Sequence, residues 1–231
     1  MKKILTSALL SATILGAGLV VSSNVKAADK TPDPASTTTG VQFKAGDEGQ
    51  IVPPVDPTDP TKPVDPIDPT DPDYPGTGNT GNLSIILATK AISFGNDNVI
   101  TAGTVNLKAD KDVVVEVADV RGTNAGWDLS VKSDQLTDGK TNTLTGAQIG
   151  LAAGKNVVAN GGTSVAATTA ALADTTTGAV VLKAVKDTGS GINVNTIAKD
   201  GVTLTIPAGI AKADVAYAST LTWSLATAPI A

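Results

Sequence analysis

The sequence contains no cysteine and no histidine. Without cysteine the chain has no disulfide framework and no residue to carry a lipid anchor, so burial alone must stabilise its folded part. Without histidine it lacks the commonest general acid–base group and the commonest metal ligand. Serine–histidine–aspartate and cysteine–histidine catalytic arrangements and the usual zinc sites are therefore excluded.

Aromatic side chains are also scarce, at 3% of residues. A glycosidase that uses a pair of carboxylates needs neither histidine nor cysteine and remains formally possible. However, Glu116 is the one glutamate after Gly76, most aspartates there fall at turns, and few aromatics are available to stack on a sugar ring. We therefore expect a protein that is not an enzyme and has no cofactor or metal site.

The charges show no basic cluster. From Gly76 onward, eleven Lys and Arg residues stand against twelve Asp and Glu, and Pro53–Pro75 carries six Asp against Lys62. Nucleic acid and anionic lipid attract clustered basic surfaces, which this chain lacks. We expect no nucleic-acid partner, and contact with a membrane only through a partner protein.

The first 27 residues have the three parts of a secretory signal peptide. Lys2 and Lys3 precede an uncharged apolar run from Ile4 to Val21, and Val25-Lys26-Ala27 follows as a small-residue cleavage site. An N-terminal membrane anchor is the alternative, because the run is long enough to span a bilayer. The cleavage site favours a signal peptide over residues 1–27 and a secreted protein.

Residues 28–80 are expected to form no packed structure. Residues 28–52 are polar and aperiodic, which predicts a disordered leader. In residues 53–80, proline recurs at every third position from Pro54 to Pro75, before a glycine-rich break. Because polyproline II has three residues per turn, this spacing predicts an extended, semi-rigid spacer of ~70 Å.

Residues 81–231 alternate short Val, Ile, Leu and Thr runs with Gly, Asn and Asp clusters. This pattern predicts an all-β domain, an antiparallel β-sandwich or a barrel-like fold. Ala152–Ala173 is expected to be a long loop or to carry a short helix at Ser164–Ala173. The strands are expected at Leu83–Ala88, Thr104–Lys108, Val113–Ala118, Trp127–Lys132, Leu144–Leu151, Ala179–Ala184, Val202–Ile206 and Val215–Leu225.

Two Trp-x-Leu motifs lie within this predicted domain. The first is Trp127-Asp128-Leu129 in VRGTNAGWDLSV, and the second is Trp223-Ser224-Leu225 in STLTWSLATAP. With these flanks, with LSIILATKAISFG at the domain start and with an acidic proline-rich stretch ahead, residues 80–231 resemble the WxL surface proteins of low-GC Gram-positive bacteria. The chain is similar to small members without an enzymatic or adhesive module.

The resemblance implies a domain that attaches non-covalently to the cell wall, with peptidoglycan as the ligand. It also implies companion surface proteins, including a membrane-anchored WxL-interacting type. The sequence shows no covalent sorting signal before Ala231, so we expect the folded domain itself to hold the protein at the cell surface. The alternative is a subunit of a surface complex, adhesive or not, whose wall association is indirect.

The motif residues allow two interpretations. Trp127 alternates with Leu129, and Trp223 with Leu225, so each pair lies on one apolar strand face. Large apolar residues at period-2 spacing usually face the interior, which favours core packing. The alternative is that these four residues form a wall-binding surface, with a partly exposed tryptophan stacked on glycan or filling a partner's pocket.

Overall fold

The computed structural model describes residues 36–68 and 70–227. The predicted signal peptide and the start of the predicted leader lie outside the described residues. Residues 36–42 belong to a separate unit, are exposed and have no regular secondary structure. In the described part, no helix is long and apolar enough to span a membrane.

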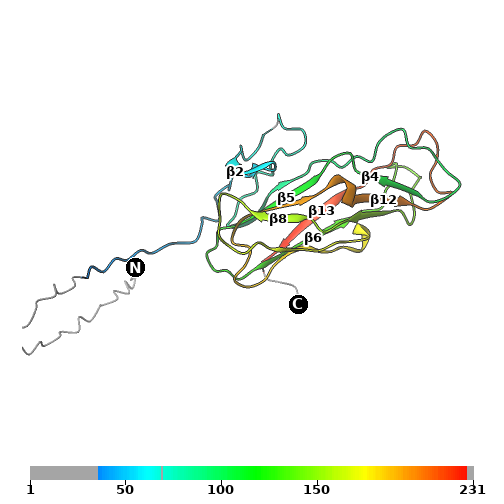
Figure 1. Cartoon of the computed structure of the whole chain (residues 1–231). Helices are drawn as coiled ribbons and strands as arrows, with labels where there is room; N and C mark the ends of the chain where they lie inside the picture. Colours follow the sequence, from blue (N-terminus) through cyan, green and yellow to red (C-terminus); the bar gives the residue numbers. More distant parts are fainter. Residues whose placement is uncertain (1–35, 69, 228–231) are drawn as a thin grey trace, which may run out of the picture. The chain divides into compact units, whose positions relative to one another are not determined.

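From Phe43 onward the chain forms an all-β domain, so the predicted fold class is confirmed (Figure 1). One four-stranded sheet has the order β13-β6-β10-β9, with bounds Leu221–Ala226, Trp127–Ser133, Ala179–Ala184 and Thr168–Thr169. The other has the order β3-β5-β11-β8, with bounds Leu83–Ala88, Val113–Asp119, Gly191–Ile197 and Lys155–Val158. All ladders are antiparallel.

A three-stranded sheet lies beside this sandwich, in the order β4-β12-β7, with bounds Val105–Lys108, Val202–Ile206 and Gln148–Leu151. It covers its own apolar cluster, which includes Leu144, Ile149 and Leu204. Two single-turn 3₁₀ helices, η1 at Thr175–Thr177 and η2 at Lys199–Gly201, lie between strands of the domain. The domain core therefore continues beyond the two main sheets.

Strand β5 is buried on both faces, as its unbroken run VVVEVAD suggests. Val115 and Val117 face the core between the sheets. Val114 and Ala118 face the opposite way and contact other apolar side chains there. Something besides the two sheets must therefore cover the outer face of this one.

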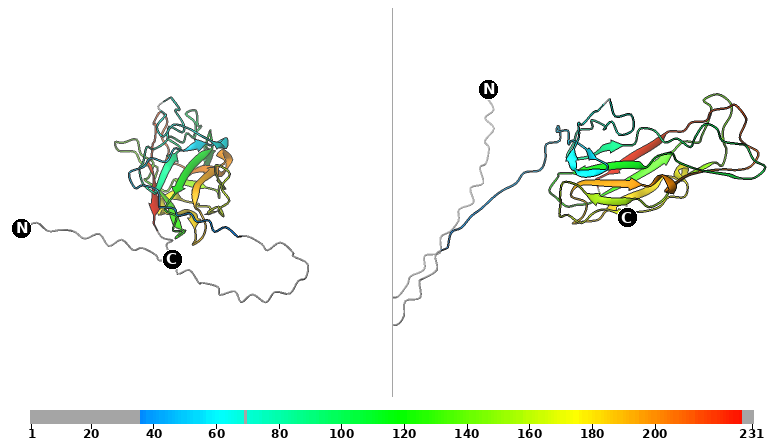
Figure 2. Two further views of the ribbon diagram at one scale, coloured as in Figure 1. Left: turned by 90° about the vertical axis from the view of Figure 1, so that its left-hand side faces the viewer. Right: turned by 45° about the horizontal axis from the view of Figure 1, so that its top comes forward.

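The cover is residues 46–82, which we call the N-terminal strap (Figure 2). Val55, in the hairpin of β1 (Val55–Asp56) and β2 (Asp59–Pro63), is fully buried in the cluster that holds Val114. Backbone hydrogen bonds join Gly46 N to the Val120 oxygen at 2.8 Å and Val120 N to the Asn82 oxygen at 2.8 Å. The strap is thus a third layer of the domain.

This arrangement differs from the extended spacer expected for the proline-rich stretch. Its Asp-Pro-Thr triplets form turns: the Asp56 carboxylate accepts from Thr58 N at 2.8 Å and from Thr58 Oγ1 at 2.7 Å. Asp59 and Asp68 bind Thr61 and Thr70 in the same way. An aspartate that bonds two residues ahead bends the chain, which proline periodicity alone does not reveal.

Outside the strap, the expected strands agree with the structure except in four places. The strand expected at Leu144–Leu151 begins only at Gln148. Residues 215–220 are not part of β13, although Ala218 forms an isolated bridge with Thr137. The segment 152–173 contains β8 and β9, and no helix. Strand β11 was not expected, because its inward positions include the polar residues Asn193 and Asn195, which are buried.

If the strap is an integral layer, shortening a buried strap side chain must destabilise the whole domain. We expect Val55→Ala to lower the free energy of unfolding by about 1–3 kcal/mol, because it removes buried methyl groups and leaves a cavity. Val99→Ala, at a side chain that is 77% exposed, is the matched control and should change little. Equal effects of the two substitutions in urea denaturation would contradict the packed strap.

A second prediction concerns Glu116, which lies on the strap side of β5 and is fully buried. Burial raises the pKa of its carboxyl group from 4.5 to about 7, although Val55 N donates to its Oε2 at 3.0 Å. Asp56, in the strap above it, raises the pKa further. The folded state therefore holds this proton more tightly than the unfolded state does.

That proton contributes stability below pH 4.5, and the contribution is lost as the pH rises towards 7. Glutamine cannot ionise, so Glu116→Gln removes this pH-dependent loss of stability. The free energy of unfolding of the variant should match that of the natural protein near pH 4.5 and exceed it at pH 8 by about 1–3 kcal/mol. Urea denaturation at both pH values tests this, with the exposed Glu48→Gln as control. The prediction would be refuted if the stability difference between Glu116→Gln and the natural protein were the same at pH 4.5 and at pH 8.

Candidate functional site

Both Trp-x-Leu motifs lie on one pair of neighbouring strands. Strand β6 carries the first and β13 carries the second, and the two strands pair in antiparallel register (Figure 1). Leu129 is the cross-strand partner of Leu225, and Trp223 is the partner of Val131. Motifs almost a hundred residues apart in the sequence thus form a single structural unit, which we call the motif strand pair.

The four motif side chains face the core between the sheets. Trp127 and Leu129 are 0% exposed, and Trp223 and Leu225 are partly buried against the same cluster. Trp223 also contacts the neighbouring cluster around Val131. Trp127 and Leu129 therefore have no exposed surface on which a ligand could stack, whereas Trp223 and Leu225 keep part of their surface exposed.

The Trp127 indole is held by a buried polar network. Its Nε1 donates to the Gly189 oxygen at 3.1 Å, and Asn193 Nδ2 donates to that same oxygen at 2.8 Å. Asn193 Oδ1 in turn accepts from Ala167 N at 3.1 Å. The indole fits only beside glycine, since a Cβ on Gly189 would lie 2.3 Å from the Ala184 Cβ. Each polar group that accompanies the tryptophan into the core is therefore satisfied.

Arg121 joins the sheets at one end of the motif strand pair, a role that sequence reasoning missed. Its guanidinium group binds both carboxylate oxygens of Asp119, at 2.9 and 2.8 Å, where β5 ends. It also donates to the Gly126 oxygen before Trp127 at 2.9 Å, and to the Thr227 oxygen after β13 at 3.1 Å. The planar fork of arginine suits such multiple contacts. An arginine six residues before the tryptophan was the available sequence signal.

The outer face of the motif strand pair is polar: Asp128 on it is buried, and the part from Ser130 to Asp134 reaches solvent. Side chains alternate along a strand, so residues between and beside the motif positions point away from the core. A shallow groove of about 670 Å³ runs over this face. Its side-chain lining comprises Ser130, Lys132, Asp134, Val180, Thr222 and Ser224.

The groove continues past the end of β6. A second depression of about 380 Å³ shares Asp134 with the first and is lined by Thr137, Tyr217 and Ser219, among others. Both depressions lie along the segment from Tyr217 to Ser224, which includes the start of β13. Such a surface suits an extended polymer better than a compact small molecule.

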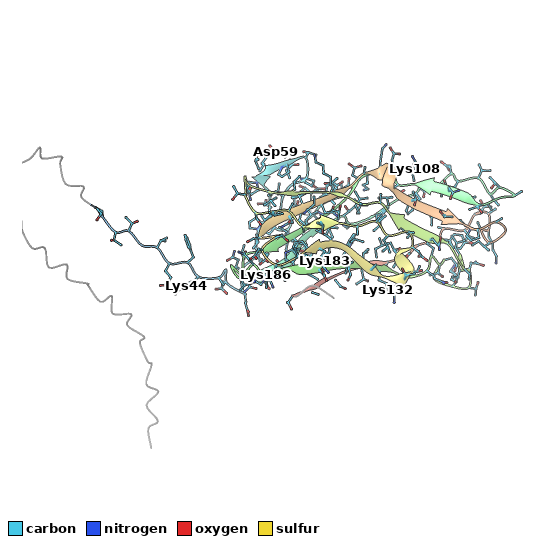
Figure 3. The ribbon with its side chains drawn as sticks, turned by 60° about the horizontal axis from the view of Figure 1, so that its bottom comes forward. Lys44, Asp59, Lys108, Lys132, Lys183 and Lys186 are labelled. Atoms are coloured by element: carbon cyan, nitrogen blue, oxygen red, sulfur yellow. The ribbon has the colours of Figure 1, made fainter. Side chains whose placement is uncertain are left out.

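The groove is lined mainly by hydrogen-bonding groups. Its central part carries one positively and one negatively charged side chain. Lys132 and Asp134 are exposed, and the other polar groups named above are hydroxyls. No cluster of three or more metal-ligating side chains occurs within residues 36–68 and 70–227. Figure 3 shows Lys132 and Lys183 on the side of the domain away from Asp59, so the strap and the groove lie on opposite faces.

The buried network predicts a large effect at Trp127. We expect Trp127→Ala to lower the free energy of unfolding by about 3–5 kcal/mol, because it opens a cavity between the sheets. It also leaves the Gly189 oxygen with one donor in place of two. Trp223→Ala, at a partly buried position, should cost less. Urea denaturation followed by circular dichroism measures both, and a smaller loss for Trp127→Ala would contradict the packing described.

A comparison with family models matches residues 30–229 to the WxL domain, described as surface cell wall-binding. No curated protein and no solved structure matches the chain. The family match covers most of the chain, including both motif strands and the strap. The chain therefore belongs to the WxL family of surface cell wall-binding domains, and the protein is located at the cell surface in association with the cell wall.

Proposed function

We propose that the domain binds peptidoglycan directly and reversibly, without catalysis, and that the groove on the outer face of the motif strand pair meets the wall. The observation that carries this proposal is the position of the groove. The two strands that define the family also form its floor and one side. Substitutions that disturb the motif would therefore distort the groove without any motif side chain touching a ligand.

Binding through this groove does not require a stacked tryptophan. Trp127 is fully buried and Trp223 faces the core, so hydroxyl groups and backbone atoms supply the contacts. From Gly76 onward the domain carries almost equal numbers of positive and negative residues. General attraction to anionic wall polymers is thus a minor force, and binding should fall only modestly with salt.

The strap has a structural part in this proposal. It packs on the sheet opposite to the groove, so it contributes stability to the domain rather than ligand contacts. This replaces the expectation that the proline-rich stretch is an extended, semi-rigid spacer. Truncating the strap should weaken binding only as far as it unfolds the domain.

The alternative function is a subunit of a surface complex that reaches the wall through a companion protein. The observation in its favour is that β13 lies at an edge of its sheet. An edge strand offers unpaired backbone groups to an added strand of a partner. Companion proteins of the WxL-interacting type are candidates for that partner.

Co-sedimentation with washed walls, stripped of protein and teichoic acid, distinguishes these functions. We expect the purified protein alone to sediment with such walls at low salt and, with a modest loss, at high salt. Thr222→Trp, which places a bulky side chain in the groove, should reduce binding while circular dichroism shows an intact fold. Asn106→Trp, at an exposed position on the edge strand β4 of the three-stranded sheet, is the matched control outside the groove. Sedimentation only after a companion surface protein is added would establish the indirect function instead.

A further inference from the structure

The central part of the groove holds two opposite charges close together. Lys132 lies on β6 and Asp134 directly follows the strand, two residues further on. Both side chains are exposed and both line the groove. Among the described residues, neither takes part in an ion pair, in contrast to Lys108, Lys111 and Arg121.

The surrounding structure fixes the spacing of these charges. Residues two apart on an extended strand point the same way and are separated by about 7 Å. Asp134 N donates to the Thr220 oxygen at 3.1 Å, so the extended backbone geometry and the contact with the second motif segment continue past the end of β6. The backbone therefore presents the Lys132 and Asp134 side chains from the same side of one extended segment.

Gly178 provides the room in which the Lys132 stem lies. It follows η1 with a φ of 69°, and a Cβ there would come within 3.4 Å of three carbons of Lys132. The turn itself is fixed by Asp174, whose Oδ1 accepts from Thr176 N at 2.9 Å. Any side chain at position 178 would be strained at this φ, and its Cβ would lie in contact with the lysine stem.

A ligand that complements this pair carries a carboxylate and an amine a short distance apart. The peptide part of peptidoglycan has this chemistry, since it contains free carboxylates and the amino group of a diamino acid. The glycan part consists of N-acetylated sugars whose lactyl carboxylates are used in amide bonds to the peptide. Hydroxyl groups alone, such as those of Ser224 and Thr222, would suit either part.

We infer that the groove recognises the peptide part of peptidoglycan, with Lys132 binding a carboxylate and Asp134 binding an ammonium group. This inference rests on the proposed direct binding to peptidoglycan and specifies which part of that polymer is bound. An exposed charge pair contributes modestly, so removing either charge should weaken binding about two- to fivefold. Removing both should weaken it further, to about tenfold.

The experiment uses the purified protein, stripped walls and two soluble competitors. Digestion of walls with an N-acetylmuramoyl-L-alanine amidase separates free peptides from peptide-free glycan strands. The lactyl carboxylates that this cut frees on the glycan are capped as methylamides, and each fraction is then added to a co-sedimentation assay. We expect the peptides to displace the protein from the walls and the glycan strands to leave it bound. Displacement by the glycan strands, or none by the peptides, would overturn the inference.

Variants test the two residues separately. Lys132→Gln and Asp134→Asn should each lower wall affinity, while Lys199→Gln, an exposed lysine on η2 outside the groove, should not. Thermal melts must match that of the natural protein. Equal affinity of Lys132→Gln and Lys199→Gln would overturn the role of the charge pair. If the natural protein fails to bind stripped walls at all, the proposed function itself is wrong, so the two failures are distinguishable.

Discussion

The placement of the Trp127 side chain is the constraint on which the sandwich depends. The indole fills the space between the two four-stranded sheets, and its nitrogen needs a hydrogen-bond acceptor there because an unsatisfied buried donor is costly. The Gly189 oxygen supplies it, and Asn193 holds the same oxygen from the next strand. One side chain thus fixes the loop at Gly189, strand β11 and strand β6 relative to one another.

The second motif extends this constraint to the edge of the sheet. Leu225 packs opposite Leu129, and Trp223 spans two core clusters, so β13 is locked to β6 in one register. A slip by one residue would turn every apolar side chain of β13 outward. The residues between the tryptophan and leucine of each motif belong to the other face, and Ser224 lines the groove there. One strand register therefore determines both the packing on the inner face and the proposed binding surface on the outer face.

The strap keeps the apolar outer face of the β3-β5-β11-β8 sheet away from solvent. Val114 and Ala118 would be exposed without it, and Val52 and Val55 cover them. The same cover buries the carboxyl group of Glu116 and raises its pKa to about 7. The strap and the groove lie on opposite sheets, so the domain separates the layer that completes its core from the surface proposed to meet the wall.

Several features followed from local patterns: strands β3, β10 and β12 at their observed bounds, the all-β class, and the apolar face shared by the residues of each motif. These follow because period-2 burial is a property of neighbouring residues.

The groove, the Arg121 contacts, strand β11 and the strap required the tertiary structure. Buried Asn193 has the sequence character of a loop residue until Gly189 and Ala167 are brought beside it. A proline every third residue indicates an extended helix until the aspartate–threonine turns bend it onto β5. Long-range partners decided these cases, and a local pattern carries no information about which distant residue will satisfy a buried polar group or cover an apolar face.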